Sequence, residues 1–133
     1  MSDLFLLDKR TDGITVITVR DLSPTVLGHW NHLRTGIYRD ALRNGRHVRI
    51  LCDLREAGWL ADEHIDWVAQ SFSPESSELW LRRSIALLTE PVALGLTEKA
   101  LGRLPATSKV NARAFLTEAD AIRWLNSRKN GEN

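Results

Sequence analysis

Short apolar runs alternate with amphipathic segments along most of this 133-residue sequence. The most apolar run lies within residues 46–54, RHVRILCDL, and has the length and β-branched content of a strand buried in a parallel sheet. It follows Asn44-Gly45, a pair typical of a helix end, and it finishes beside the acidic residue Asp53. We therefore expect a chain that repeats a unit of helix and buried strand.

The first part of the chain predicts a hairpin and then a long helix. Two β-rich runs, residues 4–7 and 14–19, flank Asp12-Gly13, which supplies the positive φ of a tight reversal. Ser23-Pro24 is typical of a helix start. The apolar residues that follow recur at steps of three and four, as one face of an amphipathic helix does, up to Gly45: Leu27, Trp30, Leu33, Ile37, Tyr38 and Ala41.

The second part predicts further helices and strands in alternation. After a loop over residues 55–61, Asp62 caps a helix that ends before Pro74, and residues 75–81 add a helical turn. Residues 84–89 predict a strand, residues 92–104 a helix that Pro105 stops, and residues 112–116 a short last strand. Thr117 caps a final helix whose inward face is formed by Ala121, Ile122, Trp124 and Leu125.

The resulting order, β-β-α-β-α-β-α-β-α, defines an α/β protein with a mixed, mostly parallel sheet and packed helices. We expect one domain over residues 1–126, followed by a frayed polar tail over residues 127–133.

Composition and charge exclude several classes of protein. The 43% hydrophobic and 26% charged residues are ordinary for a folded domain, and a net charge of +1 gives no electrostatic case for nucleic acid. The first ten residues contain only four consecutive apolar ones, so we expect neither a signal peptide nor stable membrane insertion. A single cysteine, Cys52, forms no intramolecular disulfide, and we expect a cytoplasmic location.

Four segments carry a resemblance to a known family. The hairpin with its LSP-type helix start, the strands NGRHVRILCDL and RRSIALLTE, and the ending NARAFLTEADAIRWL resemble the SpoIIAA-like proteins, which belong with the STAS fold of anti-sigma-factor antagonists. The resemblance covers most of the chain and implies a mixed sheet whose parallel strands lie in sequential order. For function it implies partner binding or, for members likened to lipid-carrying domains, an apolar ligand.

The phosphorylation site of the antagonists is the sharpest point of comparison. In them, the strand equivalent to residues 48–54 ends in Asp, an apolar residue and then a Ser or Thr. The corresponding residues here are Asp53, Leu54 and Arg55, and arginine accepts no phosphoryl group. We therefore expect the phospho-switch to be absent. Arg55 instead offers a planar cation for an acidic ligand at the carboxyl end of a strand. The alternative is a surface ion pair with Asp53 or Glu56, in which Asp53 orients the loop.

The remaining chemistry-bearing residues give no catalytic set, and we expect no enzyme, no metal site and no cofactor. His29 and His32 are three residues apart but lack further ligands on the same helix face. His47 has no Ser or Cys nucleophile in a recognisable motif beside it. Cys52 lies in the most apolar strand, which favours core packing over reactivity.

Large apolar side chains around the loop after residue 54 leave two function classes open. Trp59, Leu60, Trp67 and Trp80 form either a satellite cluster under that loop, a contact face, or the wall of a lipid-sized pocket. Together with Asp53 and Arg55 they are the candidate binding residues. We favour a regulatory protein-interaction module that is a homodimer and has a possible protein partner. The alternative is a carrier or sensor of a small apolar or lipid-like ligand, with Arg55 holding an acidic head group.

Overall fold

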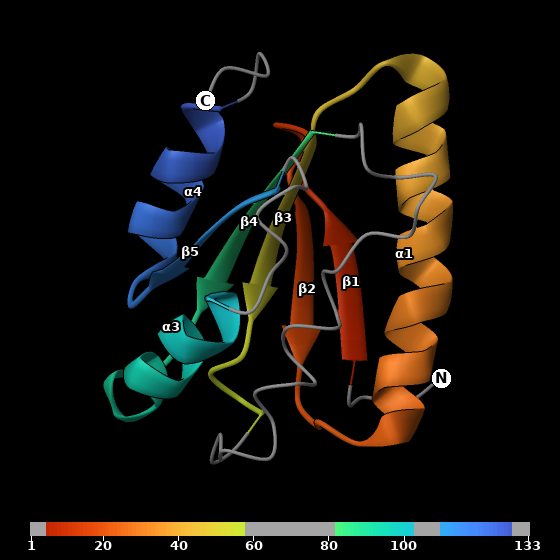
Figure 1. The fold of residues 1–133 in the computed structure, drawn as a ribbon. Helices are drawn as coiled ribbons and strands as arrows, with labels where there is room; N and C mark the ends of the chain where they lie inside the picture. Colours follow the sequence, from red (N-terminus) through yellow and green to blue (C-terminus); the bar gives the residue numbers. More distant parts are fainter. Residues whose placement is uncertain (1–4, 58–81, 103–109, 129–133) are drawn as a thin grey trace.

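The computed structural model describes residues 5–57, 82–102 and 110–128, which form a mixed sheet with helices on both faces (Figure 1). The strands are β1 (Phe5–Lys9), β2 (Thr15–Val19), β3 (Val48–Asp53), β4 (Arg83–Leu88) and β5 (Val110–Phe115). The helices are α1 (Pro24–Asn44), the 3-10 turn η3 (Pro91–Ala93), α3 (Leu94–Leu101) and α4 (Glu118–Asn126). This is the α/β class that the alternating pattern predicts.

The five strands lie side by side in the order of the sequence, β1-β2-β3-β4-β5. β1 runs antiparallel to β2, whereas β2, β3, β4 and β5 are mutually parallel. The parallel strands therefore begin at one end of the sheet, where β1 finishes. Residues that precede β3 and β4 meet there, because Val48 pairs with Arg83.

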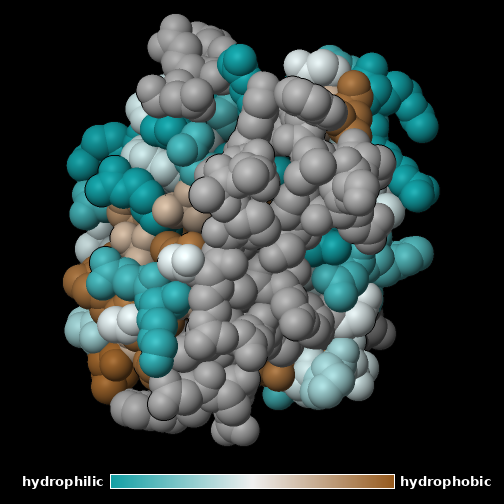
Figure 2. All heavy atoms as spheres, in the orientation of Figure 1, coloured by the Kyte–Doolittle hydropathy of each residue, from teal (hydrophilic) through white to brown (hydrophobic). Residues whose placement is uncertain are grey.

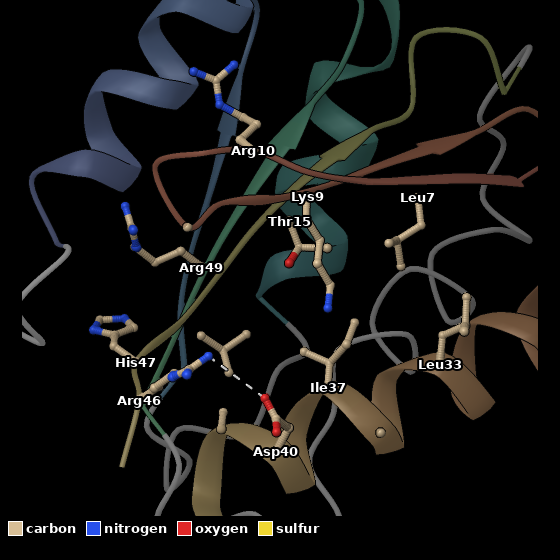
Figure 3. Close-up of a pocket in the computed structure, with 14 residues that line it drawn as sticks. Leu7, Lys9, Arg10, Thr15, Leu33, Ile37, Asp40, Arg46, His47 and Arg49 are labelled. Carbon is tan, nitrogen blue, oxygen red and sulfur yellow. Dashed lines mark ion pairs between the residues drawn. The ribbon is translucent and has the colours of Figure 1, made fainter. Parts of the chain in front are cut away.

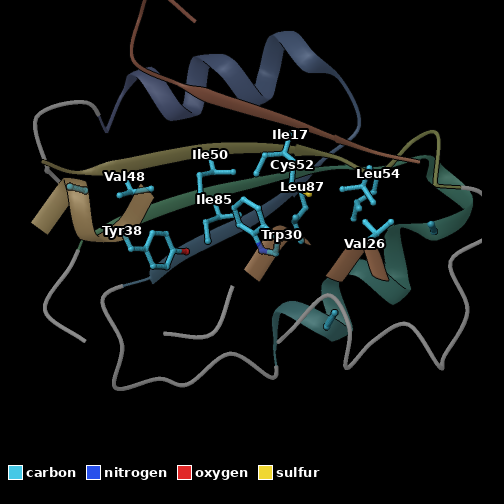
Figure 4. Close-up of a cluster of buried hydrophobic side chains, with 14 residues drawn as sticks. Ile17, Val26, Trp30, Tyr38, Val48, Ile50, Cys52, Leu54, Ile85 and Leu87 are labelled. Carbon is cyan, nitrogen blue, oxygen red and sulfur yellow. The ribbon is translucent and has the colours of Figure 1, made fainter. Parts of the chain in front are cut away.

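Two apolar layers hold helices against the sheet. On one face, α1 and α3 cover side chains of β2, β3 and β4, with Trp30 and Tyr38 of α1 among the largest buried residues (Figure 4). On the other face, Ala121 and Leu125 of α4 pack with Leu51. All six residues of β3 and of β4 are buried, as expected for inner strands covered on both faces.

Capping residues set the bounds of α1 and α4. The Ser23 hydroxyl accepts a hydrogen bond from the Val26 amide at 3.4 Å, and Thr117 accepts one from the Asp120 amide at 3.2 Å. Gly45 adopts φ 63°, the left-handed conformation that ends a helix with little strain only for glycine. These predicted helix ends are confirmed.

The helix predicted over residues 92–104 differs in its first turn. Residues Pro91–Ala93 form a 3-10 turn, and the α-helix begins only at Leu94. The strands predicted over residues 84–89 and 112–116 each begin earlier, at Arg83 and Val110. The helix predicted from Asp62 lies outside the described residues.

Polar side chains gather over the outer face of α1, on the right of Figure 2, whereas apolar side chains gather near α3 and the start of α4 at the lower left. Val92 lies in η3, which precedes α3, and Leu116 lies between β5 and α4; they are 60% and 45% exposed. Among the described helices, none combines the length and the low charge that a membrane span requires.

Candidate functional site

A cavity of about 510 Å³ opens between the β1–β2 hairpin and α1, at the end of the sheet where the parallel strands begin (Figure 3). Its apolar wall comes from three separate elements. β1 contributes one side chain, α1 contributes three and β3 one: Leu7, Leu33, Ile37, Ala41 and Val48. Because Leu7 lies opposite Ile17 in the β1–β2 register, it faces the same side of the sheet as the α1 core.

Cations outnumber anions around this cavity. Lys9, Arg10, Arg46 and Arg49 line it, together with His47, against one carboxylate, that of Asp40. Arg46 and Asp40 form a loose ion pair at 3.9 Å in which both side chains are more than 60% exposed, 68% and 62%, so it contributes little stability.

The basic side chains divide into two groups by direction (Figure 3). Lys9 points into the space between the hairpin and α1, toward Ile37, and Arg46 turns toward Asp40 on the same side. Arg10, Arg49 and His47 point to the other side of the sheet, where α4 lies. The strand alternation explains the division, since Val48 faces α1 and Arg49 therefore faces α4.

Arg49 is a buried cation, 8% exposed, that joins three distant parts of the chain. Its guanidinium donates to the Asp12 carbonyl oxygen in the hairpin turn, to the Leu125 carbonyl oxygen at 3.4 Å and to the Asn126 Oδ1 at 2.9 Å. Burial lowers the pKa of Arg49. The acceptors are all neutral, so the charge of Arg49 is not cancelled by a direct ion pair among them.

His47 lies beside Arg49, held by a buried serine. Its Nε2 atom is 2.7 Å from the Ser84 Oγ atom. Burial lowers the pKa of His47, and the charges of Arg49, Arg128 and Arg82 lower it further. A serine next to an imidazole has the geometry of an activated nucleophile, but Ser84 is 0% exposed, and a substrate has no path to its oxygen in this conformation.

Asp53 and Arg55 form a local ion pair at the opposite end of the sheet. The Arg55 Nε and Nη2 atoms donate to the two Asp53 oxygens, each at 3.0 Å, and the Arg55 amide donates to the Asp53 Oδ1 at 3.0 Å. This is the ion pair that the sequence offers as the alternative to ligand binding. A binding role for the two residues stays a prediction.

The other candidate binding residues, Trp59, Leu60, Trp67 and Trp80, lie outside the described residues.

Cys52 is 2% exposed within the core under α1, and burial raises the pKa of its thiol. Within the described part of the chain, no three His, Cys, Asp or Glu side chains are grouped as metal ligands.

Asp53 and Arg55, the two predicted site residues that the structure describes, lie at the end of the sheet opposite the cavity. The sequence carries one local signal for the cavity: Arg46, His47 and Arg49 lie within four residues, and Lys9-Arg10 precedes the hairpin turn. The net charge of the whole chain is near zero because acidic residues elsewhere balance these cations, so it does not indicate the local cluster. The sheet order that brings the two segments together is a tertiary property.

The chain matches no protein-family model, no curated protein and no solved structure. The functional argument therefore rests on the geometry and charge of the site.

Proposed function

We propose that this protein is a non-catalytic binding module that takes up a small apolar ligand with an acidic group in the cavity between β1 and α1. The observation that carries the proposal is a cavity of about 510 Å³ with an apolar wall and Lys9 pointing into it. It takes up the alternative that the sequence left open, a carrier of a small apolar ligand, with the ligand at the end of the sheet opposite Asp53 and Arg55.

Size and lining favour a small organic ligand. The cavity volume of about 510 Å³ falls within the roughly 300–1,000 Å³ of small-molecule sites. Leu33 and Ile37, one turn apart on α1, face Leu7 of β1 across it, which suits an alkyl or other apolar tail. The Lys9 ammonium favours a carboxylate or another acidic group near that tail.

We include in this proposal that the domain is a SpoIIAA-like member of the STAS fold without the phospho-switch. The sequential order of the parallel strands and the arginine at residue 55 support it. A kinase assay that found phosphorylation next to Asp53 would contradict the second part.

The first experiment is native mass spectrometry of the freshly purified protein, before and after denaturation. An excess of mass that disappears on denaturation supports a bound ligand and gives its class. Binding is then measured by calorimetry with dodecanoate, a carboxylate with an apolar tail. We expect Lys9→Ala to weaken binding by about threefold to tenfold, since a partly exposed ion pair contributes about 1 kcal/mol.

Ile37→Asp tests the apolar wall, because a carboxylate there repels the ligand and wets the cavity. The matched control is Arg39→Ala, which removes an exposed cation from the same helix outside the cavity. A folded Ile37→Asp variant that binds dodecanoate as tightly as the parent protein would refute the proposal.

A second candidate is self-association through β1, as a homodimeric interaction module. β1 is the edge strand of the described sheet, and Leu6 and Leu7 are 41% and 36% exposed. An exposed apolar edge strand is a template for pairing with a second copy. Light scattering of Leu6→Lys tests it: a dimer that persists unchanged excludes this edge as the interface, and a dimer that dissociates supports it.

A further inference from the structure

Four basic side chains gather on the α4 side of the sheet, where β3 and β4 begin. They are His47, Arg49, Arg82 and Arg128, called here the basic cluster. The parallel register explains the gathering, because Val48 pairs with Arg83 and so places His47 and Arg82 next to each other. Arg128 follows α4, whose last residue, Asn126, contacts Arg49 at 2.9 Å.

The His47 ring presents one nitrogen to this cluster. Ser84 fixes Nε2 at 2.7 Å, whereas Nδ1 is buried and has no hydrogen-bond partner among the described residues. The same holds for the Nε atom of Arg128, whose guanidinium lies 4.9 Å from the centre of the Trp124 ring. Buried polar atoms in proteins are nearly always paired, so both atoms are candidates for contact with a bound acceptor.

The charge around His47 favours an anion. The charged groups that act on His47, from β3, from the start of β4 and from the end of α4, are cations. Asp12 accepts a hydrogen bond from Arg49 through its carbonyl oxygen, whereas its carboxylate pairs with Arg10 at 3.1 Å. A positive charge that is partly buried and held in place is a site for an oxyanion with several acceptor oxygens.

We propose that the basic cluster binds a phosphate group, which accepts hydrogen bonds from His47 Nδ1 and from the guanidinium of Arg128, with Arg82 and Arg49 adding charge. A phosphate has enough oxygens to meet several of these donors at once and carries nearly two charges at neutral pH. The inference rests on other observations than the proposed apolar ligand does: His47 and Arg49 also border the cavity, but Arg82 and Arg128 do not line it. A phosphate beside the ring favours its protonated form and therefore raises the pKa of His47.

The test is a titration of the full chain with inorganic phosphate, followed by NMR of the histidine side chains, with sodium chloride at equal ionic strength as the reference. The spectrum of His47→Gln assigns the His47 signals. We expect a saturable shift of these signals and a rise in the pKa of His47. Arg128→Gln should weaken the response roughly tenfold or more. The matched control Arg123→Gln, an exposed residue paired with Asp120 one turn earlier in α4, should leave it unchanged.

Dodecyl phosphate distinguishes the source of the phosphate group. If it acts on His47 at much lower concentration than inorganic phosphate, and Ile37→Asp removes that difference, the phosphate is the head group of the cavity's ligand. If both act at the same concentration, the site takes a free or small phosphate compound. The proposal is wrong if neither compound moves the His47 signals, if chloride moves them equally, or if Arg128→Gln responds as the parent protein does. The three results that contradict the proposal do not depend on whether dodecanoate binds in the cavity.

Discussion

Replacing Arg49 by methionine should destabilise the fold by about 2–4 kcal/mol. Methionine keeps the apolar stem but removes all three guanidinium contacts, to Asp12, Leu125 and Asn126. The exposed Asn126 amide can turn to water, whereas the carbonyl oxygens of Asp12 and Leu125 lose a charged donor. Each hydrogen bond to a charged group contributes about 1.5–3 kcal/mol, and relief of the buried charge offsets part of the loss.

This loss is large beside the total, since domains of this size have unfolding free energies of about 5–15 kcal/mol. Urea unfolding followed by circular dichroism at 222 nm measures it. The control is Arg123→Met, which removes an exposed pair with Asp120 and should change stability by less than about 0.5 kcal/mol. An Arg49→Met variant within about 0.5 kcal/mol of the parent protein would show that Arg49 does not fasten the hairpin to α4.

Gly13 gives an independent check of the same contact. Its φ is +88°, and a Cβ atom there would lie 2.7 Å from the Arg49 Nη2 atom. Gly13→Ala alone should therefore cost more than the roughly 1–2 kcal/mol of a left-handed alanine. The double variant Gly13→Ala with Arg49→Met lacks this clash. Its loss of unfolding free energy should therefore be smaller than the sum of the losses of the two single variants. Strict additivity would place the Arg49 guanidinium elsewhere.

Three further outcomes follow from buried or paired titratable groups. The Arg10 guanidinium holds the pKa of Asp12 at about 2, below its usual 3.8. The ion pair therefore stabilises the fold above the unfolded pKa, and this contribution is lost as the pH falls toward 2. The urea midpoint of Asp12→Asn should vary less with pH in that range than the midpoint of the parent protein. Burial and nearby arginines lower the pKa of His47 from 6.5. As the pH falls, the unfolded chain binds a proton at His47 before the folded chain does, so the free energy of unfolding decreases below pH 6.5. His47→Gln should reduce this dependence of stability on pH. An unchanged dependence would contradict the burial of the ring. Burial raises the pKa of the Cys52 thiol, so a disulfide reagent should label it only as fast as the chain unfolds, and rapid labelling in native buffer would refute its place in the core.

The local sequence determined most element types because each depends on neighbours in the chain. Ser23-Pro24 and Gly45 set the two ends of α1, and Thr117 sets the start of α4. The apolar run of β3 was enough to predict a buried strand. The start of α3 was missed because Pro91 fits the first turn of a 3-10 segment as well as that of an α-helix, and local residues do not decide between them.

The cavity and the basic cluster were decided by tertiary structure. Arg49 interrupts the apolar pattern of its strand, and nothing near it in the sequence shows that carbonyl oxygens 37 and 76 residues away accept its hydrogen bonds. His47 meets Ser84, 37 residues later, only because β3 and β4 are parallel neighbours. Short-range pattern fixes which segments become helices and strands, whereas the pairing of parallel strands, which joins distant segments, fixes which charges meet.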